Sequence, residues 1–377
     1  MVVINSYSIA VIMCVITMIC WGSWANTQKM VGHKNWPVQL FYWDYVIGLF
    51  LLSLLLAFTM GSYGPANEGR TFIEDLLQAK GNALLSAFIG GVIFNASNIL
   101  LVIAIEIAGL SVAFPVGVGL ALVLGVITNY EPATVTRPTL LLIGVTLVLA
   151  AIFLSAIAYK NLHKKTQSKN QSKNQNKNRN RNQNYNQRPT TPNTGSSKEN
   201  SKKVLKGLMI SLFAGALMGT FFHFIMESIG TTDYARLIPG KLGPYTAMVV
   251  FSLAILLSNF IWNSLNMYWP IVGKPCKYSD YFSGASGANV ATHSVGILGG
   301  VIWGVGTSFS IIASGAAGAA ISWGLGQGAT MVAAIWGVFI WKEFKGASSC
   351  TNKMIGLMFV SYVVGLTLII ISKGANG

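Results

Sequence analysis

The sequence predicts an all-α membrane protein with ten transmembrane helices, arranged as two inverted five-helix repeats. Three observations lead to this prediction. The 377 residues are 53% hydrophobic and only 10% charged, with a mean hydropathy of +0.55, which is far too apolar for a soluble domain of this size. A strongly polar segment separates two apolar blocks of similar length. Each block contains five runs that are long enough to cross a bilayer.

These ten apolar runs define the expected spans. A hydrocarbon core about 30 Å thick requires about 20 residues of α-helix. The first run has no basic start and no small-residue cleavage site, so we expect a retained span rather than a signal peptide. The expected spans are Tyr7–Gln28, Pro37–Met60, Asn82–Ile107, Leu110–Thr128, Pro138–Tyr159, Gly207–Ile229, Tyr245–Tyr268, Ser294–Ala313, Ala316–Trp341 and Met354–Ser372.

The polar segment at the centre of the chain predicts a disordered linker. It consists mainly of Asn, Gln, Lys, Arg and Ser, and a segment of this composition cannot bury enough apolar surface to offset the entropy lost on ordering. The predicted domains are therefore a first five-helix repeat at 1–160, the linker at 161–205 and a second five-helix repeat at 206–377.

The linker also predicts the topology. Residues 160–206 hold 13 of the 26 basic residues and one acid, Glu199. A net charge of +15 would favour nucleic acid as the partner of a soluble chain. Here we expect no nucleic acid, because basic residues collect on the cytoplasmic side of membrane proteins and contact anionic lipid headgroups of the bilayer. We therefore expect a multi-pass protein of the cell membrane, with the linker in the cytoplasm and both termini outside. The short loops expected on the cytoplasmic side agree, since they carry Lys29, Lys34, Lys274, Lys277, Lys342, Lys345 and Lys353.

Several short patterns recur in the two halves. Because each half has an odd number of spans, two copies would insert with opposite orientations. This is the plan of secondary transporters, whose substrate site lies near the midplane between the repeats. The matches are Gly90-Gly91-Val-Ile with Gly299-Gly300-Val-Ile, Gly125 and Glu131 with Gly337 and Glu343, Gly144 with Gly356, and Pro37 with Pro244.

Asp44 is the most informative charged residue within a span. It lies about 10 Å into a helix that begins at Pro37, where an acid is costly and commonly functional. Two interpretations stay open. Asp44 either forms an ion pair with Lys29 across the first loop, or it acts as a carboxylate that binds a proton or the substrate.

Amide and aromatic side chains within the spans favour a flat, polar solute. Amides both donate and accept hydrogen bonds, and Asn98 and Gln327 are the amides that we expect to bind the solute. Trp21, Trp24 and Trp303 could stack on its ring. The alternatives are that the amides tie helices together and that the tryptophans belong to the interfacial aromatic belt.

Other classes of protein have little support. The chain has no HExxH or GxSxG motif, and its histidines are dispersed, so an enzyme is not expected. The four cysteines are scattered without a CxxC pair, so we expect neither a zinc site nor a disulfide framework, and no cofactor. A receptor is disfavoured because the chain has no folded domain outside the membrane.

The pattern resembles the ureide permease family of the drug/metabolite transporter superfamily. The resemblance covers nearly all of both halves. It is carried by Asp44-Tyr45, Gly90-Gly91 with Asn98, Gly109-Leu-Ser-Val, Pro244-Tyr-Thr-Ala, Tyr268-Trp-Pro-Ile-Val-Gly with Pro275, and Gln327 nine residues before Trp336-Gly-Val.

This resemblance implies a ten-span plasma-membrane carrier for allantoin and related oxo derivatives of nitrogen heterocycles, including uracil and xanthine, driven by protons. Plant members carry a nucleotide-binding-like glycine loop in the central segment. This linker contains no GxxxxGK, so we expect no ATP. Its low complexity points to a distant, microbial member of the family.

The expected function is import of a small polar solute by alternating access. Trp21, Trp24 and Trp303 would face the solute ring, while Asn98 and Gln327 would bind its amide edges. Asp44 would take the coupling proton, or pair with Lys29 in one state. Sugar uptake of the glucose/ribose type is an alternative, because related porters share the plan. Export of a metabolite or drug is another.

Overall fold

Long apolar helices make up the structure, which is a computed structural model. It describes residues 1–32, 36–65, 68–108, 110–181, 195–271, 273–283 and 288–373. Within these ranges every regular element is a helix and none is a strand. Nine helices among the described residues are long and apolar enough to cross a membrane. The all-α membrane class is therefore confirmed, whereas the count of ten spans stays a prediction.

The first half follows the expected spans closely. The span expected at Leu110–Thr128 has the predicted boundaries. The first span is interrupted at Trp24, where α1 ends and α2 begins. The helices are α1 (Tyr7–Ser23), α2 (Ala25–Gly32), α3 (Val38–Phe58), α4 (Phe72–Gln78), α5 (Gly81–Ala108), α6 (Leu110–Thr128) and α7 (Pro138–Arg181).

The second half contains one span that is broken. The run expected at Ala316–Trp341 is divided at Gln327 and Gly328 and ends in one turn of π-helix, η3. Glycines on both sides of Gln327 weaken the helix there. The helices are α8 (Gly195–Ile229), α9 (Pro244–Tyr268), α10 (Tyr278–Phe282), α11 (Val290–Ala317), α12 (Ala319–Gly326), α13 (Ala329–Ile335), η3 (Trp336–Ile340) and α14 (Ser349–Ile371).

Helix extends into both ends of the linker, while its disorder stays a prediction. The α7 helix continues to Arg181 and α8 begins at Gly195. Gln, Lys and Arg have good helix propensity, and a span that is already helical removes the cost of nucleation. Residues 182–194 of the linker, together with Lys34 and Gly109, lie outside the described residues.

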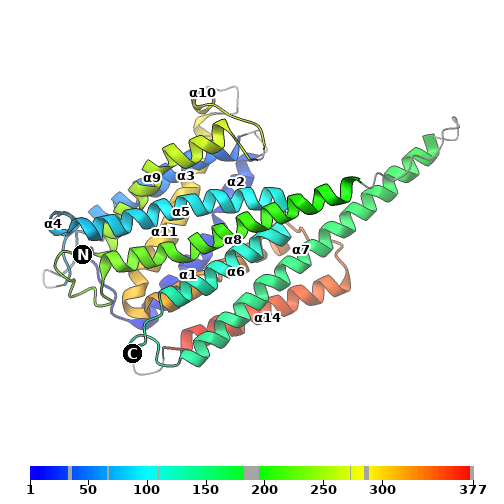
Figure 1. Cartoon of the computed structure of the whole chain (residues 1–377). Coiled ribbons are helices and arrows are strands. Elements are labelled where there is room, and N and C mark those ends of the chain that lie inside the picture. The colour runs from blue at the N-terminus through cyan, green and yellow to red at the C-terminus, as the bar shows by residue number, and fades with distance from the viewer. Residues whose placement is uncertain are drawn as a thin grey trace.

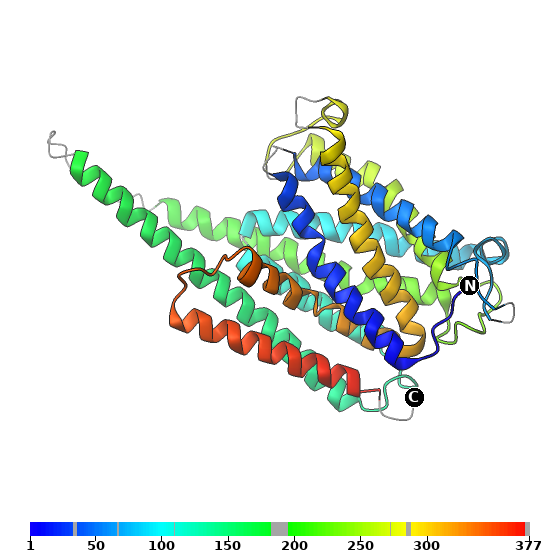
Figure 2. The ribbon, with the colours of Figure 1, turned by 180° about the vertical axis from the view of Figure 1, so that it is seen from behind.

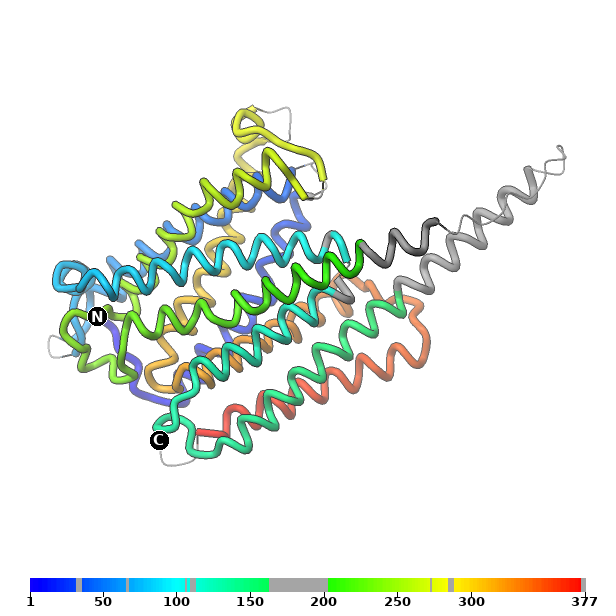
Figure 3. Tube along the Cα trace, viewed as in Figure 1, coloured from blue at the N-terminus to red at the C-terminus, as the bar shows by residue number. Residues whose placement is uncertain are grey.

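The helices form one bundle whose two ends are easily told apart (Figure 1). The N-terminus and the end of α14 lie at one end, together with α4 (Figures 1 and 3). We call this the far end, and the opposite end, where α7 and α8 lead into the linker, the linker end. Helices α7 and α14 run side by side along one edge of the bundle (Figure 2). The N-terminus and the end of α14 thus lie at one end, although the side of the membrane on which that end lies stays a prediction.

Packing in the first half recurs in the second. Helix α5 packs on α8 and α9, and α11 packs in the same way on α1 and α3. Helix α6 packs on α7 and α8, as the broken span packs on α14 and α1. Close approaches of glycine recur as well. A Cβ atom at Gly91 would lie 2.3 Å from the Phe251 oxygen, and one at Gly300 would lie 1.9 Å from the Tyr45 oxygen. This recurrence supports the inverted repeat.

Candidate functional site

A cavity of about 460 Å³ lies between the two halves, in the linker-end part of the bundle. Cavities of this size commonly hold small molecules. Its wall includes residues from the break between α1 and α2, the second part of α5, the start of α6, and α7. The second half contributes α13, η3 and the turn that follows η3. Both interrupted spans thus line the cavity, as discontinuous helices do at transporter sites.

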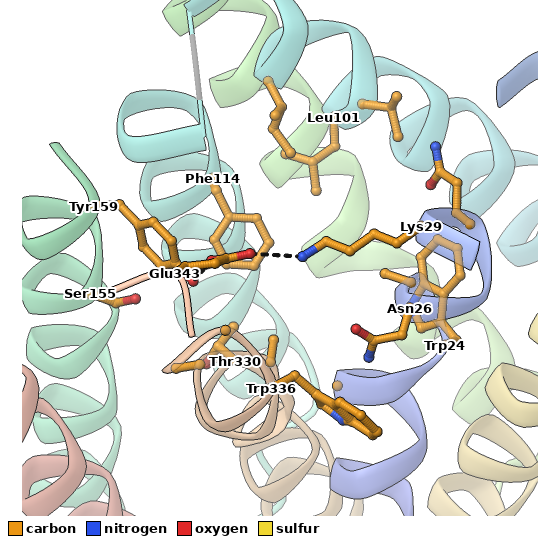
Figure 4. Close-up of a pocket in the computed structure, with 18 of the residues that line it drawn as sticks. Trp24, Asn26, Lys29, Leu101, Phe114, Ser155, Tyr159, Thr330, Trp336 and Glu343 are labelled. Atoms are coloured by element: carbon orange, nitrogen blue, oxygen red, sulfur yellow. Dashed lines mark hydrogen bonds and ion pairs between the residues drawn. The ribbon is translucent and has the colours of Figure 1, made fainter. Parts of the chain in front are cut away.

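An ion pair crosses this cavity. Lys29 Nζ lies 2.9 Å from Glu343 Oε1, and Tyr159 OH donates to Glu343 Oε2 at 3.0 Å. The Lys29 side chain reaches over from α2, opposite Tyr159 on α7 (Figure 4). The side chains of Lys29 and Glu343 are 51% and 30% exposed, so the pair stands near the rim of the cavity. Polar groups there can donate to a carbonyl and accept from an N–H.

Local backbone geometry delivers Glu343 to the cavity. The π-helical turn η3 ends beside Trp341, and Lys342 then adopts φ 52°, a left-handed conformation that is uncommon for a residue other than glycine. The chain therefore turns sharply just before Glu343. A Cβ atom at Gly337 would lie 2.5 Å from Tyr159 OH and 3.0 Å from Glu343 Oε2, so glycine leaves the space that the two side chains occupy.

Two of the five expected solute-binding residues line this cavity. Trp24 lies on its wall and packs on Tyr45 with ring centroids 4.9 Å apart. Asn98 lines it from α5 and is 9% exposed. Lys29, expected as a possible ion-pair partner, lines it too.

The other three expected residues lie outside the cavity wall. Trp21 and Trp303 stack on each other, with centroids 6.1 Å apart and planes at 15°, and Trp21 Nε1 donates to Thr307 Oγ1 at 3.0 Å. Gln327 is buried in the break between α12 and α13, where its backbone oxygen accepts from Thr330. The stacked indoles thus fill the bundle interior in this conformation, and their role in solute binding stays a prediction.

Asp44 lies in a second polar cluster near the start of α3. Its side chain is 0% exposed. His293 Nδ1 of α11 lies 2.8 Å from Asp44 Oδ1, and Tyr281 OH of α10 donates to the same oxygen. The Trp36 ring packs against both Tyr281 and His293. Asp44 Oδ2 has no hydrogen-bond partner among the described residues.

Asp44 and Lys29 are therefore not partners of each other in this conformation, because each already binds another group. In the hydrogen bond between Tyr281 and Asp44, the tyrosine hydroxyl is the donor. Burial, together with the hydrogen bond and the charge of Asp44, raises the pKa of the Tyr281 phenol, so its proton stays on the oxygen. The proton-coupling role of Asp44 stays a prediction.

Four residues at these two clusters were not selected from the sequence: Tyr159, Tyr281, His293 and Glu343. A signal was present for Glu343, which matches Glu131 in the repeat pattern. The histidines were set aside because they are dispersed along the chain, although folding brings His293 to Asp44. Among the described residues, no three His, Cys, Asp or Glu side chains gather as a metal site would require.

Hydrogen bonds connect the two halves at the far end of the bundle. Arg70, just before α4, donates to Asp75 Oδ1 at 2.8 Å and to the Lys241 oxygen at 2.8 Å. It also donates to the oxygens of Leu237 and Ile238 at 3.3 Å. Asp75, whose side chain is 2% exposed, accepts from the Gly243 N–H at 2.6 Å. We call this group of contacts the Arg70 tie.

Comparisons with known proteins agree with this architecture. The chain is 24% identical to "Ureide permease 1" of Arabidopsis thaliana, with 99% of each chain covered. It is also 24% identical to "Probable ureide permease A3" of Vigna unguiculata, over 79% of this chain and 86% of that protein. The ureide permease family model matches residues 41–200 and 190–372. The apolar helices and these matches together identify a multi-pass membrane protein, and the chain belongs to the ureide permease family.

Proposed function

We propose that this protein is a secondary transporter that imports ureides, with allantoin as the first candidate. The observation that carries the proposal is the cavity of about 460 Å³ between the halves, in a chain that resembles ureide permeases over nearly its whole length. Uracil and xanthine form a second group of candidate solutes, because they too are flat rings with adjacent N–H and carbonyl groups.

The polar groups of the cavity suit a ureido group. A carboxylate such as Glu343 accepts two parallel N–H bonds, and a ureido group presents two such N–H groups side by side. The Lys29 ammonium can donate to its carbonyl, and the Trp24 indole offers an apolar face for the ring. The solute would thus enter between the two charges that now bind each other at 2.9 Å.

We propose that this conformation is the one in which the cavity opens toward the linker end. The cavity lies in the linker-end part of the bundle, while the Arg70 tie closes the far end. With the basic linker in the cytoplasm, solute would leave this cavity toward the cytoplasm. If the two inverted repeats exchanged conformations, the far end would open and the linker end would close.

Proton coupling is proposed to act at Asp44. Its partners are Tyr281 from α10 and His293 from α11, with Trp36 packed over both. A carboxyl group and an imidazole ring can each carry a proton. Figure 1 shows α10 beyond the end of α9, and the protonation of Asp44 would loosen or fasten the contact of α10 with α3 and α11.

Uptake measurements test the proposal. Cells that express the protein receive radiolabelled allantoin or uracil at acid and neutral external pH, with unlabelled glucose and ribose as competitors. We expect saturable uptake that rises at acid pH and is indifferent to the sugars. Glu343→Gln should reduce uptake strongly, whereas Glu131→Gln, at the exposed matching position near the far end, should not. Displacement by sugars, or efflux without uptake, would replace the proposal by a sugar porter or an exporter.

A further inference from the structure

A chain of hydrogen bonds leads from α9 through α5 and α3 to the cavity. Asn95 Nδ2 donates to the backbone oxygen of Ile255 at 3.2 Å and to Ser258 Oγ at 2.9 Å. Tyr42 OH donates to Asn95 Oδ1 at 3.0 Å. Asn98 Nδ2 donates to the Tyr42 oxygen at 3.1 Å. The three side chains Tyr42, Asn95 and Asn98 are all buried, so each contact is protected from competing water.

The backbone oxygen of Ile255 fixes the direction of every bond in this chain. A carbonyl only accepts, so Asn95 must turn its NH2 group toward Ile255 and its Oδ1 toward Tyr42. The single hydroxyl proton of Tyr42 is then given to Asn95, and its oxygen can only accept from Asn98. Asn98 must consequently turn its NH2 group toward Tyr42 and its Oδ1 away from it.

The Asn98 side chain ends at the cavity wall. In the described part of the chain, no side chain or backbone N–H donates to Asn98 Oδ1. The hydrogen-bond chain thus gives one Asn98 amide hydrogen to Tyr42 and leaves Oδ1, on a residue that lines the cavity, free to accept. An amide free to rotate could present either group, so the distinction depends on Tyr42 and Asn95.

We propose that Tyr42 and Asn95 are positioning residues that hold Asn98 as a hydrogen-bond acceptor toward the cavity, which selects solutes with an N–H group at that place. The inference rests on the proposed function and specifies its chemistry. A ureido or lactam N–H would satisfy Asn98 Oδ1. A methylated nitrogen or a ring acceptor would leave this buried oxygen unpaired, which is the costly outcome in polar recognition.

Tyr42→Phe is the direct perturbation, because it removes the hydroxyl and leaves the ring. Tyr45→Phe is the matched control, since it lies on the same helix and its buried hydroxyl has no partner among the described residues. The measurement is the KM for uptake of hydantoin and of its N-methylated analogue. The ratio of the two KM values reports how strongly the site requires the N–H group.

We expect Tyr42→Phe to reduce this ratio about fivefold, the size of one neutral hydrogen bond, and Tyr45→Phe to leave it unchanged. Loss of packing alone would alter uptake of both compounds equally and leave the ratio unchanged. Adding Asn98→Asp to Tyr42→Phe should restore the preference for N–H, because a carboxylate accepts in any orientation. An unchanged ratio in Tyr42→Phe, or an equal fall in Tyr45→Phe, would overturn the inference.

Failure of the proposed function has a different signature. If the wild-type protein takes up neither allantoin nor hydantoin, the same two compounds are titrated onto the purified full-length protein, with tryptophan fluorescence as the readout because Trp24 lines the cavity. A binding preference for the N–H compound that Tyr42→Phe removes would support the inference without transport. Equal binding of both compounds by the wild-type protein would overturn it.

Discussion

The Arg70 tie makes a quantitative prediction about closure of the far end. Arg70 belongs to the first half, and three of its acceptors are backbone oxygens of the loop between α8 and α9 in the second half. Its fourth acceptor, Asp75, is nearly inaccessible to solvent. In Arg70→Ala these bonds are lost, and the Asp75 carboxylate keeps only neutral donors.

The expected magnitude follows from the hydrogen bonds that cross between the halves. Arg70 and Asp75 both belong to the first half, so their ion pair is not specific to the closed state. A hydrogen bond from a charged group contributes about 1.5–3 kcal/mol, and we take about 3 kcal/mol for the three bonds to the second half together, because the Arg70 side chain is partly exposed. If these three bonds exist only when the far end is closed, this cost applies to that state alone. The equilibrium between closed and open far ends should then shift about 100-fold toward the open state.

Thiol labelling measures this shift. Ser308 is buried near the far end, in the wall of a small gap between α3, α9 and α11. In a protein whose four native cysteines are replaced, Ser308→Cys should react with a membrane-impermeant maleimide added outside the cell. Arg70→Ala should raise the labelling rate by up to about 100-fold, and Arg70→Lys by less, because lysine keeps the charge but not the fork of donors.

Arg236→Ala is the control, since Arg236 is exposed in the same loop and should leave the rate unchanged. A labelling rate that is the same in Arg70→Ala as in the parent protein would refute the idea that this tie closes the far end. An equal rise in Arg236→Ala would show that any loss of loop charge has this effect.

Three further predictions concern the two clusters and the packing. Asp44→Asn should remove the stimulation of uptake by acid while surface expression, measured by biotinylation, is retained; normal pH-dependent uptake would exclude Asp44 as the proton site. Lys29→Met should raise the KM for allantoin, and the exchange Lys29→Glu with Glu343→Lys should restore only part of it, because the ion pair returns with its charges reversed; full recovery would mean that the pair acts as a latch and not as a ligand. Gly300→Ala should destabilise the protein by about 2 kcal/mol or more, since overpacking costs about 1–3 kcal/mol and the new Cβ would lie 1.9 Å from the Tyr45 oxygen. Gly356→Ala, with nothing within 4 Å of the new atom, should be neutral or stabilising, and thermal unfolding in detergent compares the two.

The spans could be predicted because hydropathy is a local property of the chain. The span at Leu110–Thr128 has the expected ends, and α5, α9 and α14 differ from expectation by a few residues at their ends. The interruptions at Trp24 and Gln327 were not predicted, because hydropathy joins the residues on both sides of each break into one span. A local signal was present at Gln327, in the two glycines that flank it.

The cavity residues were harder to predict for a related reason. A transmembrane helix is apolar on all sides, so periodicity does not indicate which face turns inward. Trp21 and Trp24 were equivalent candidates in the sequence, yet only Trp24 lines the cavity. Glu343 lies beyond the expected end of the ninth span, and His293 precedes the expected start of the eighth span at Ser294. Both were therefore placed in loops, where a charged or titratable residue is common and, unlike one within a span, does not indicate a functional site.

The two ends of the bundle use matching helices with different chemistry. Helix α4 lies between the second and third spans, and α10 lies between the seventh and eighth, so the two are counterparts in the proposed repeat. Each has an acid as its third residue, and this acid accepts a hydrogen bond from a backbone N–H three residues earlier, Glu74 from Thr71 at 3.1 Å and Asp280 from Lys277 at 2.8 Å.

Beyond this shared start the contacts diverge, and the difference has a mechanistic consequence. At the far end an arginine, a residue type that stays charged in proteins, binds a carboxylate and backbone oxygens. At the linker end Tyr281 of α10 binds Asp44, which also contacts His293, and Asp44 is the group at which we propose that the coupling proton binds. A proton would therefore act on one end of the bundle only. Such an asymmetry is what a proton-coupled importer requires, because coupling needs one of two otherwise equivalent closures to depend on the bound proton.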